Sequence, residues 1–192
     1  MIHLKTACVV MMCCITTVMS ASTCSATPAK GSKKPEKKEI IAVPDSVVVS
    51  MIGEDAAAVI FTAKKATLFI MRPTVKPKDQ DKTIGGVLVG KQVRKLNRSE
   101  QYLFQFMLAD SLSYTDVPIV PTTPYLPTVA IEFESKYGIC QLLFSLTSQE
   151  VGIVVNGQEV TVLRYRNARL ITRFFAENIN EKFYNDILKL LQ

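Results

Sequence analysis

The chain of 192 residues contains no tryptophan and a single histidine, His3, close to its start. A cysteine–histidine zinc cluster is therefore excluded, and so is a cysteine nucleophile activated by histidine. Four of the five cysteines lie within the first 24 residues and only Cys140 lies further on, which excludes a disulfide framework. The sequence accordingly predicts no cofactor and no metal site.

The chain also lacks an apolar run of the roughly 20 residues that span a bilayer. Its start instead combines Lys5, an apolar stretch from Ala7 to Met19 and small residues around Cys24, which is typical of a secretory signal peptide over residues 1–24. Two processing routes stay open. A peptidase cuts between small residues and releases a soluble protein, or Cys24 becomes lipid-modified, because Ala21-Ser22-Thr23-Cys24 resembles a bacterial lipobox. A cytosolic N-terminus is the third alternative.

The domain has little net charge of either sign. The whole chain carries +6 with a pI near 9.1, but from Ile40 onward 17 Lys plus Arg face 15 Asp plus Glu, a net charge of +2. The excess lies mainly in the Lys- and Pro-rich residues 25–39, which are predicted to form a flexible tether. Its lysines would be attracted to anionic headgroups beside a bilayer, with a plain solvated spacer as the alternative. No nucleic-acid partner is expected.

The remaining residues, 40–192, have the size of a single domain with a hydrophobic core. Asn156-Gly157 predicts a type I′ hairpin turn, and alternating apolar residues on either side predict its two strands. Similar alternation around Ile131 and Phe144 adds two more, giving a C-terminal four-strand antiparallel meander with one apolar face. The expected cross-strand neighbours are Val151 with Val162, Ile153 with Val160, Leu146 with Val151, Phe144 with Ile153, and Leu142 with Val155.

A sheet with one apolar face needs a cover, and apolar residues at helical spacing predict the segments that provide it. Two further strands and one proline-rich linker, Val117–Pro127, are also expected. The predicted fold class is α+β, a mostly antiparallel sheet with helices packed on one face. The expected helices are 167–177, 181–191 capped by Asn180, one capped by Ser99 and running to about Leu112, and one from Asp45 or Ser46 through Thr62; the strands are Ala66–Met71 and Ile84–Val89. A strand at Val47–Val49 is the alternative to the start of the first helix.

The only basic cluster of the domain consists of Arg164, Arg166, Arg169 and Arg173. The first two are expected to alternate to the same side of a strand end, and the last two lie one helical turn apart. Such a group of guanidiniums can bind a carboxylate, a phosphate or an acidic polysaccharide. A solvated helix face, balanced by nearby glutamates, is the alternative.

A second candidate site is the segment Gln149, Glu150, Val151 and Gly152, which resembles the inhibitory Q-x-V-x-G loop of cystatins. It departs from that loop because its glycine directly follows the valine. A helix followed by a four-strand meander also resembles the cystatin order. The resemblance implies a protease inhibitor acting through the 149–152 loop, and a tight turn with Val151 in the core is the alternative.

Three weaker patterns bear on catalysis. Glu132 and Glu134 share one sheet face, and paired carboxylates can act as acid and base in a hydrolase such as a glycosidase when burial separates their pKa values. A solvated strand edge is the alternative. Gly85–Lys91 has the spacing of a phosphate-binding loop, but Gln92 stands where Ser or Thr should hold magnesium. Cys140 falls on the apolar face and is expected to be a small core residue.

The lipobox-like signal, the Lys-rich tether and the run from Pro127 through Gly157 into Arg-bearing helices resemble small uncharacterised envelope proteins of Bacteroidota. That resemblance favours a lipid anchor at Cys24 and implies no site residues. The leading hypothesis is a non-enzymatic exported envelope protein, periplasmic, outer-membrane-attached or secreted, that binds a protein or glycan partner. A cystatin-like inhibitor and a carboxylate-based hydrolase are the alternatives.

Overall fold

A computed structural model describes residues 41–115 and 123–191 of the chain. The predicted signal peptide, Cys24 and the tether 25–39 lie outside these residues, as does part of the expected linker. Residues Glu39–Gln192 form one compact unit. In chain order its elements are α1 Ser46–Ile52, α2 Glu54–Thr62, β1 Lys65–Arg72, β2 Thr83–Ile84, β3 Val87–Lys95, α3 Arg98–Ala109, the 3-10 helix η1 Ser111–Ser113, β4 Val129–Ser135, β5 Gly138–Ser145, β6 Glu150–Val155, β7 Gln158–Arg164, α4 Ala168–Asn178 and α5 Lys182–Leu190.

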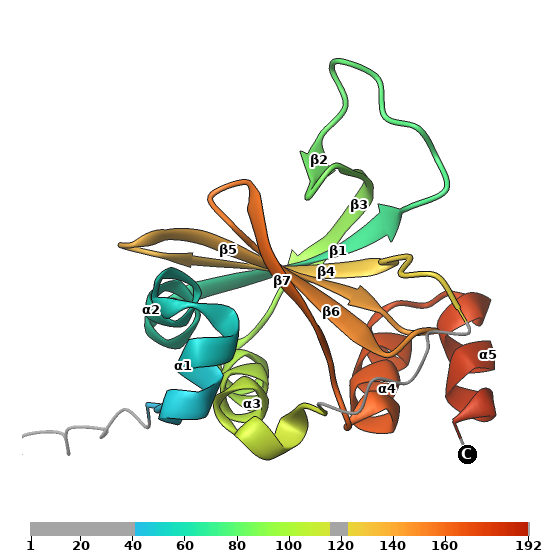
Figure 1. Cartoon of the computed structure of the whole chain (residues 1–192). Coiled ribbons are helices and arrows are strands. Elements are labelled where there is room, and N and C mark those ends of the chain that lie inside the picture. Colours follow the sequence, from blue (N-terminus) through green and yellow to red (C-terminus); the bar gives the residue numbers. More distant parts are fainter. Residues whose placement is uncertain (1–40, 116–122, 192) are drawn as a thin grey trace, which may run out of the picture. The chain divides into compact units, whose positions relative to one another are not determined.

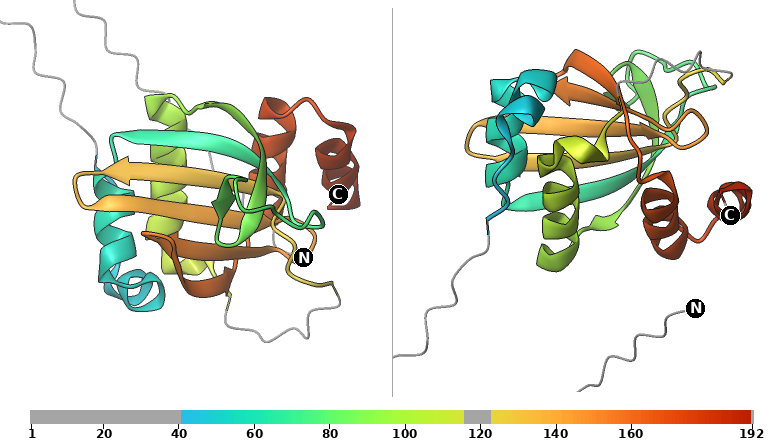
Figure 2. Two further views of the ribbon diagram at one scale, coloured as in Figure 1. Left: turned by 90° about the horizontal axis from the view of Figure 1, so that it is seen from above. Right: turned by 60° about the horizontal axis from the view of Figure 1, so that its bottom comes forward.

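The strands form one seven-stranded antiparallel sheet in the order β2-β3-β1-β4-β5-β6-β7. The helices lie on one side of this sheet, while β2 and the loop before it rise on the other (Figures 1 and 2). The predicted α+β class, with a C-terminal antiparallel meander and helices on one face, is therefore confirmed. Within the described ranges, no helix has both the length and the hydropathy that crossing a membrane requires.

Both faces of the sheet carry buried apolar residues. The helix side holds the larger core, which includes Leu68, Ile131 and Phe144. The opposite side has a small core that includes Leu143 and Val154 and is covered by the β2–β3 turn. Gly85 permits this cover because its φ is +55° and a Cβ there would lie 3.1 Å from Cγ2 of Val154. Gly85 and Gly86 of the phosphate-loop-like stretch thus form a hairpin turn, and Gly90 lies within β3. The expected strand Ile84–Val89 is wrong because that turn divides it between β2 and β3.

The meander forms as expected, but two of its registers differ from the prediction. In β5–β6, Phe144 lies opposite Val151, two residues from the expected register, so the apolar face is retained. In β6–β7 a bulge shifts the register by one residue, and Val151 pairs with Leu163 instead of Val162. A shift of one residue exchanges the faces of a strand. The expectation that Val160 and Val162 are core residues is therefore wrong, and both are exposed.

The first two helices were expected as one. The Val48 N–H donates to the Asp45 side chain over 2.7 Å, so Asp45 caps α1 as predicted. Gly53, with φ +86°, then ends α1 and begins α2, which divides the expected helix. Glycine adopts this positive φ without the steric penalty that a Cβ brings, which explains why the break falls there.

Two predicted caps are also wrong. Helix α3 begins after Asn97, whose side chain accepts from the Glu100 N–H while the Glu100 carboxylate accepts from the Asn97 N–H. This reciprocal capping box satisfies two backbone donors, so Asn97 competes successfully with Ser99 for the cap. The helix ends at Ala109, before the expected Leu112, and α5 begins after Glu181 without a side-chain cap from Asn180.

Candidate functional site

Helix α4 carries two of the four arginines of the predicted basic cluster, and its buried apolar side determines which way these two point. Ile171 and Phe175 are buried. The Phe175 ring lies 5.2 Å from that of Phe144 on the sheet and 6.0 Å from that of Phe104 on α3. Because this stripe is anchored in the core, Arg169 and Arg173 on the opposite side of the helix are exposed.

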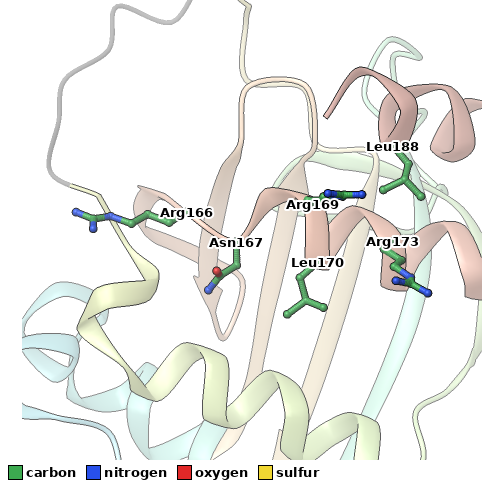
Figure 3. Close-up of a pocket in the computed structure, with 6 residues that line it drawn as sticks. All are labelled: Arg166, Asn167, Arg169, Leu170, Arg173 and Leu188. Atoms are coloured by element: carbon green, nitrogen blue, oxygen red, sulfur yellow. The ribbon is translucent and has the colours of Figure 1, made fainter. Parts of the chain in front are cut away.

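These arginines line an open hollow of about 630 Å³ between α4 and α5. Figure 3 shows Arg169 and Arg173 on the side where Leu188 of α5 lies, while Arg166 extends away from them. Leu170 points toward the side of α3 in the same view. The arginine patch is defined here as Arg166, Arg169 and Arg173, and the remaining lining residues of the hollow are Asn167, Leu170 and Leu188.

The charges of the patch are only partly neutralised. Nε of Arg173 lies 2.8 Å from Oε1 of Glu177, one helical turn away, and this hydrogen bond raises the pKa of the Arg173 guanidinium. Among the described residues, no acidic side chain forms an ion pair with Arg166 or Arg169. Two exposed guanidiniums with unused donors are therefore available to an anionic ligand.

Arg164, the fourth predicted member, does not join the patch. It lies opposite Glu150 on the neighbouring strand, with its Nη2 3.8 Å from Oε1 of Glu150 and both side chains largely buried. A partly buried guanidinium with a carboxylate partner contributes to the hairpin rather than to an open surface. The structure therefore brings together three of the four predicted arginines.

The cystatin-like segment has a packing role in this conformation. Val151 is buried on β6 and Gly152 lies under Tyr125, whose hydroxyl would clash with any Cβ added to Gly152. The Tyr125 hydroxyl donates to the Leu143 carbonyl over 3.0 Å, which places its ring against the strand. In the β5–β6 loop only Thr147 is exposed, so the valine and glycine of the motif are not presented as an inhibitory wedge.

The candidate acid–base residues each have a separate partner. Glu132 accepts a hydrogen bond from Nε2 of Gln141 over 2.7 Å, and Glu134 lies 3.3 Å from Nζ of Lys65. Burial raises the pKa of Cys140 to about 12, so this thiol stays protonated at neutral pH. Within residues 41–115 and 123–191, no group of three or more His, Cys, Asp or Glu side chains has a metal-binding arrangement.

Sequence analysis missed the apolar members of the hollow. Leu170 precedes Arg173 by three residues, so these two positions are neighbours on the surface of α4, whereas Arg166 lies before the helix begins at Ala168. That spacing was a usable signal, because an exposed leucine among arginines departs from a simple solvated face. Leu188 reaches the hollow only through the packing of α5 against α4, which the spacing on one helix does not reveal.

No protein-family model, no curated protein and no solved structure matches the chain.

Proposed function

We propose that this protein is an exported, membrane-tethered envelope protein that binds an acidic group of a glycan or protein partner through the arginine patch. In this proposal residues 1–24 direct export, Cys24 carries the lipid anchor and residues 25–39 form the tether. The layout of the sequence, which resembles that of Bacteroidota envelope proteins, supports this part. The domain then acts by binding rather than by catalysis.

One observation carries the choice of site. Arg166, just before α4, and Arg169, within α4, have no ion pair among the described residues, and both border the open hollow beside a helix that is anchored in the core. Guanidiniums bind carboxylates and phosphates through two parallel hydrogen bonds, and a rigid helix presents them without much loss of entropy. An anionic ligand is therefore the best chemical fit.

The apolar lining of the hollow narrows the class of ligand further. Leu170 and Leu188 lie beside the guanidiniums, so the hollow combines charged donors with apolar carbon surface. A uronic acid fits this combination, because its carboxylate matches arginine and the C–H face of its ring packs on leucine. The volume of about 630 Å³ lies within the roughly 300–1,000 Å³ usual for ligand sites.

The test uses oligogalacturonate as the acidic probe and a neutral maltooligosaccharide of the same length as its control. Replacing Arg169→Ala together with Arg173→Ala should weaken oligogalacturonate binding at least tenfold in calorimetry, because each lost charge-assisted hydrogen bond contributes about 1.5–3 kcal/mol. The Tm should stay unchanged, since both side chains are exposed.

The matched control is the pair Lys182→Ala and Lys189→Ala, which removes the same charge from α5 but no residue of the hollow. It should change the affinity less than threefold. An equal loss of affinity in both double variants would mean that oligogalacturonate binding depends only on the net charge of the domain. No binding of oligogalacturonate by the wild type, or equal binding of the neutral sugar, would contradict an acidic-glycan site.

A further inference from the structure

Helix α3 departs from an ordinary amphipathic helix, because it buries two glutamines and exposes two large apolar side chains. Gln101 and Gln105 are 1% and 2% exposed, while Leu103 and Phe106 are 40% and 46% exposed. Nε2 of Gln105 donates to the Ile60 carbonyl over 2.6 Å, and Nε2 of Gln101 donates to the Ala63 carbonyl. The glutamines thus satisfy carbonyls at the C-terminal end of α2, and they take buried positions beside Phe104 and Leu108, while Leu103 and Phe106 face solvent.

Helix α4 lies antiparallel beside α3 and continues this surface. Arg94 contacts both Glu100 at the start of α3 and Asn178 at the end of α4. The Phe104 and Phe174 rings lie 4.8 Å apart between the two helices. The right view of Figure 2 shows the helical layer that contains α3 and α4 from its outer side. The α3–α4 apolar face is defined here by its exposed members Leu103, Phe106, Leu112 and Leu170.

Basic residues border this face on both sides. The arginine patch lies on the α4 side. On the other side Arg98 and Lys64 line a groove with Tyr102, and the Arg98 guanidinium stacks 4.6 Å from the centre of the Tyr102 ring. The nearby acids are Asp45, whose side chain accepts from the Ser111 N–H; Glu100, which pairs with Arg94; Glu177, which pairs with Arg173; and Asp110, whose side chain accepts from the Leu112 N–H.

The point where the chain enters the domain lies beside the same face. Ile41, the first described residue, lines the groove with Arg98 and Tyr102. Only 16 residues separate Cys24 from Ile41, and such a length spans at most about 50–60 Å when fully extended. A lipid anchor at Cys24 would therefore hold the domain within about that distance of the bilayer, which is enough for this face to reach it.

We propose that the α3–α4 apolar face docks on an anionic lipid bilayer. Leu103, Phe106 and Leu170 insert at the boundary between headgroups and acyl chains, and the bordering arginines contact lipid phosphates. Apolar side chains flanked by basic residues are the usual composition of interfacial membrane-binding surfaces. The biological setting rests on the proposed export and tethering, but the binding itself is a property of the domain and can be measured without the acyl group.

The experiment uses the unacylated chain 25–192, which includes the whole compact unit. It is sedimented with vesicles of phosphatidylcholine containing phosphatidylglycerol and, separately, with vesicles of phosphatidylcholine alone. The wild type should bind the anionic vesicles and remain in solution with the neutral ones. Replacing Leu103→Ser and Phe106→Ser should lower partitioning at least tenfold with an unchanged Tm.

The matched control is Val75→Ser with Ile139→Ser, which removes two side chains of similar exposure that lie on the β1–β2 loop and on β5. It should leave vesicle binding unchanged. Arg169→Ala with Arg173→Ala should lower binding to anionic vesicles and flatten its dependence on salt, because fewer lipid charges are contacted.

Two results would overturn the proposal. If the wild type stays in solution with both kinds of vesicle, the face does not bind membranes, and a partner helix with an acidic border becomes its best occupant. If Leu103→Ser with Phe106→Ser partitions like the wild type, membrane binding occurs elsewhere, for example through the tether lysines. Failure of the glycan proposal is distinguishable, because the wild type would then bind anionic vesicles but not oligogalacturonate.

Discussion

Helices α3 and α4 lie side by side on the same sheet, yet they relate sequence to burial in opposite ways. Helix α4 buries Ile171 and Phe175 and exposes its arginines. Helix α3 buries Phe104 together with two glutamines and exposes Leu103 and Phe106. The comparison teaches that polar residues enter the core when a neighbouring helix end supplies carbonyls for their amides.

The largest expected effect is a difference in stability between variants of Phe104 and Phe106, two phenylalanines of α3. The Phe104 ring contacts the rings of Phe144, Phe174 and Phe175, so Phe104→Ala should lower the free energy of unfolding by about 3–5 kcal/mol. Phe106→Ala, two residues further along, should change it by no more than about 1 kcal/mol because that side chain is about half exposed. Urea denaturation of both variants measures the difference.

Similar losses of unfolding free energy in both variants would show that Phe106 is packed against the domain in solution, which would contradict the observed orientation of α3. A loss confined to Phe104→Ala agrees with the observed orientation. The same pair also bears on the proposed membrane face, because Phe106 can insert into lipid only if its removal leaves the fold intact.

The next effect concerns a buried amide. Gln105→Met keeps nearly the same length but removes the donor to the Ile60 carbonyl, so it should destabilise the protein by about 1–3 kcal/mol. Gln92→Met, at an exposed position of β3, serves as the control and should be nearly neutral. If Gln105→Met is neutral or stabilising, the buried glutamine does not stabilise the fold, and its hydrogen bond does not determine the orientation of α3.

Much of the fold could be predicted because apolar periodicity matched burial. The alternation around Ile131, Phe144 and Ile153 gave the meander, and the helical spacing of Ile171 and Phe175 gave α4 with its exposed arginines. In these elements nearly every buried position is apolar, with Ser145 on β5 and Thr172 on α4 as exceptions, so a one-dimensional pattern predicts them well. The class of fold follows directly, since a sheet with an apolar face requires covering helices.

The missed features depend on partners that are distant in sequence. The inverted face of α3 depends on carbonyls of α2, and the removal of Arg164 from the patch depends on Glu150 across the hairpin. The bulge in β7 contains no glycine that would indicate it in the sequence, and yet it changes the face on which Val160 and Val162 lie. Periodicity on one element cannot reveal such contacts, and this is why only part of the candidate site was predicted.

The smallest effect concerns the charged connection between α3 and α4. Nη1 and Nη2 of Arg94 donate to the two oxygens of Glu100 over 2.8 and 2.6 Å, and the guanidinium also donates to Asn178. The hydrogen bond from Arg94 holds the pKa of Glu100 below its usual range. Glu100→Gln should therefore destabilise the protein at neutral pH by at most about 1 kcal/mol, as expected for a partly exposed ion pair.

The pH dependence gives the sign of this contribution. A carboxyl whose pKa is lower in the folded state stabilises the protein above its unfolded pKa of about 4.3, and the stabilisation is lost as the pH falls through the folded value. The difference between wild type and Glu100→Gln should thus be constant from pH 8 to about 5 and shrink below about 4.3. Glu134→Gln, which removes the exposed pair with Lys65, is the control. If the difference for Glu100→Gln does not depend on pH, the carboxylate acts through its capping hydrogen bond to Asn97, which a glutamine oxygen can replace, and not through its charge.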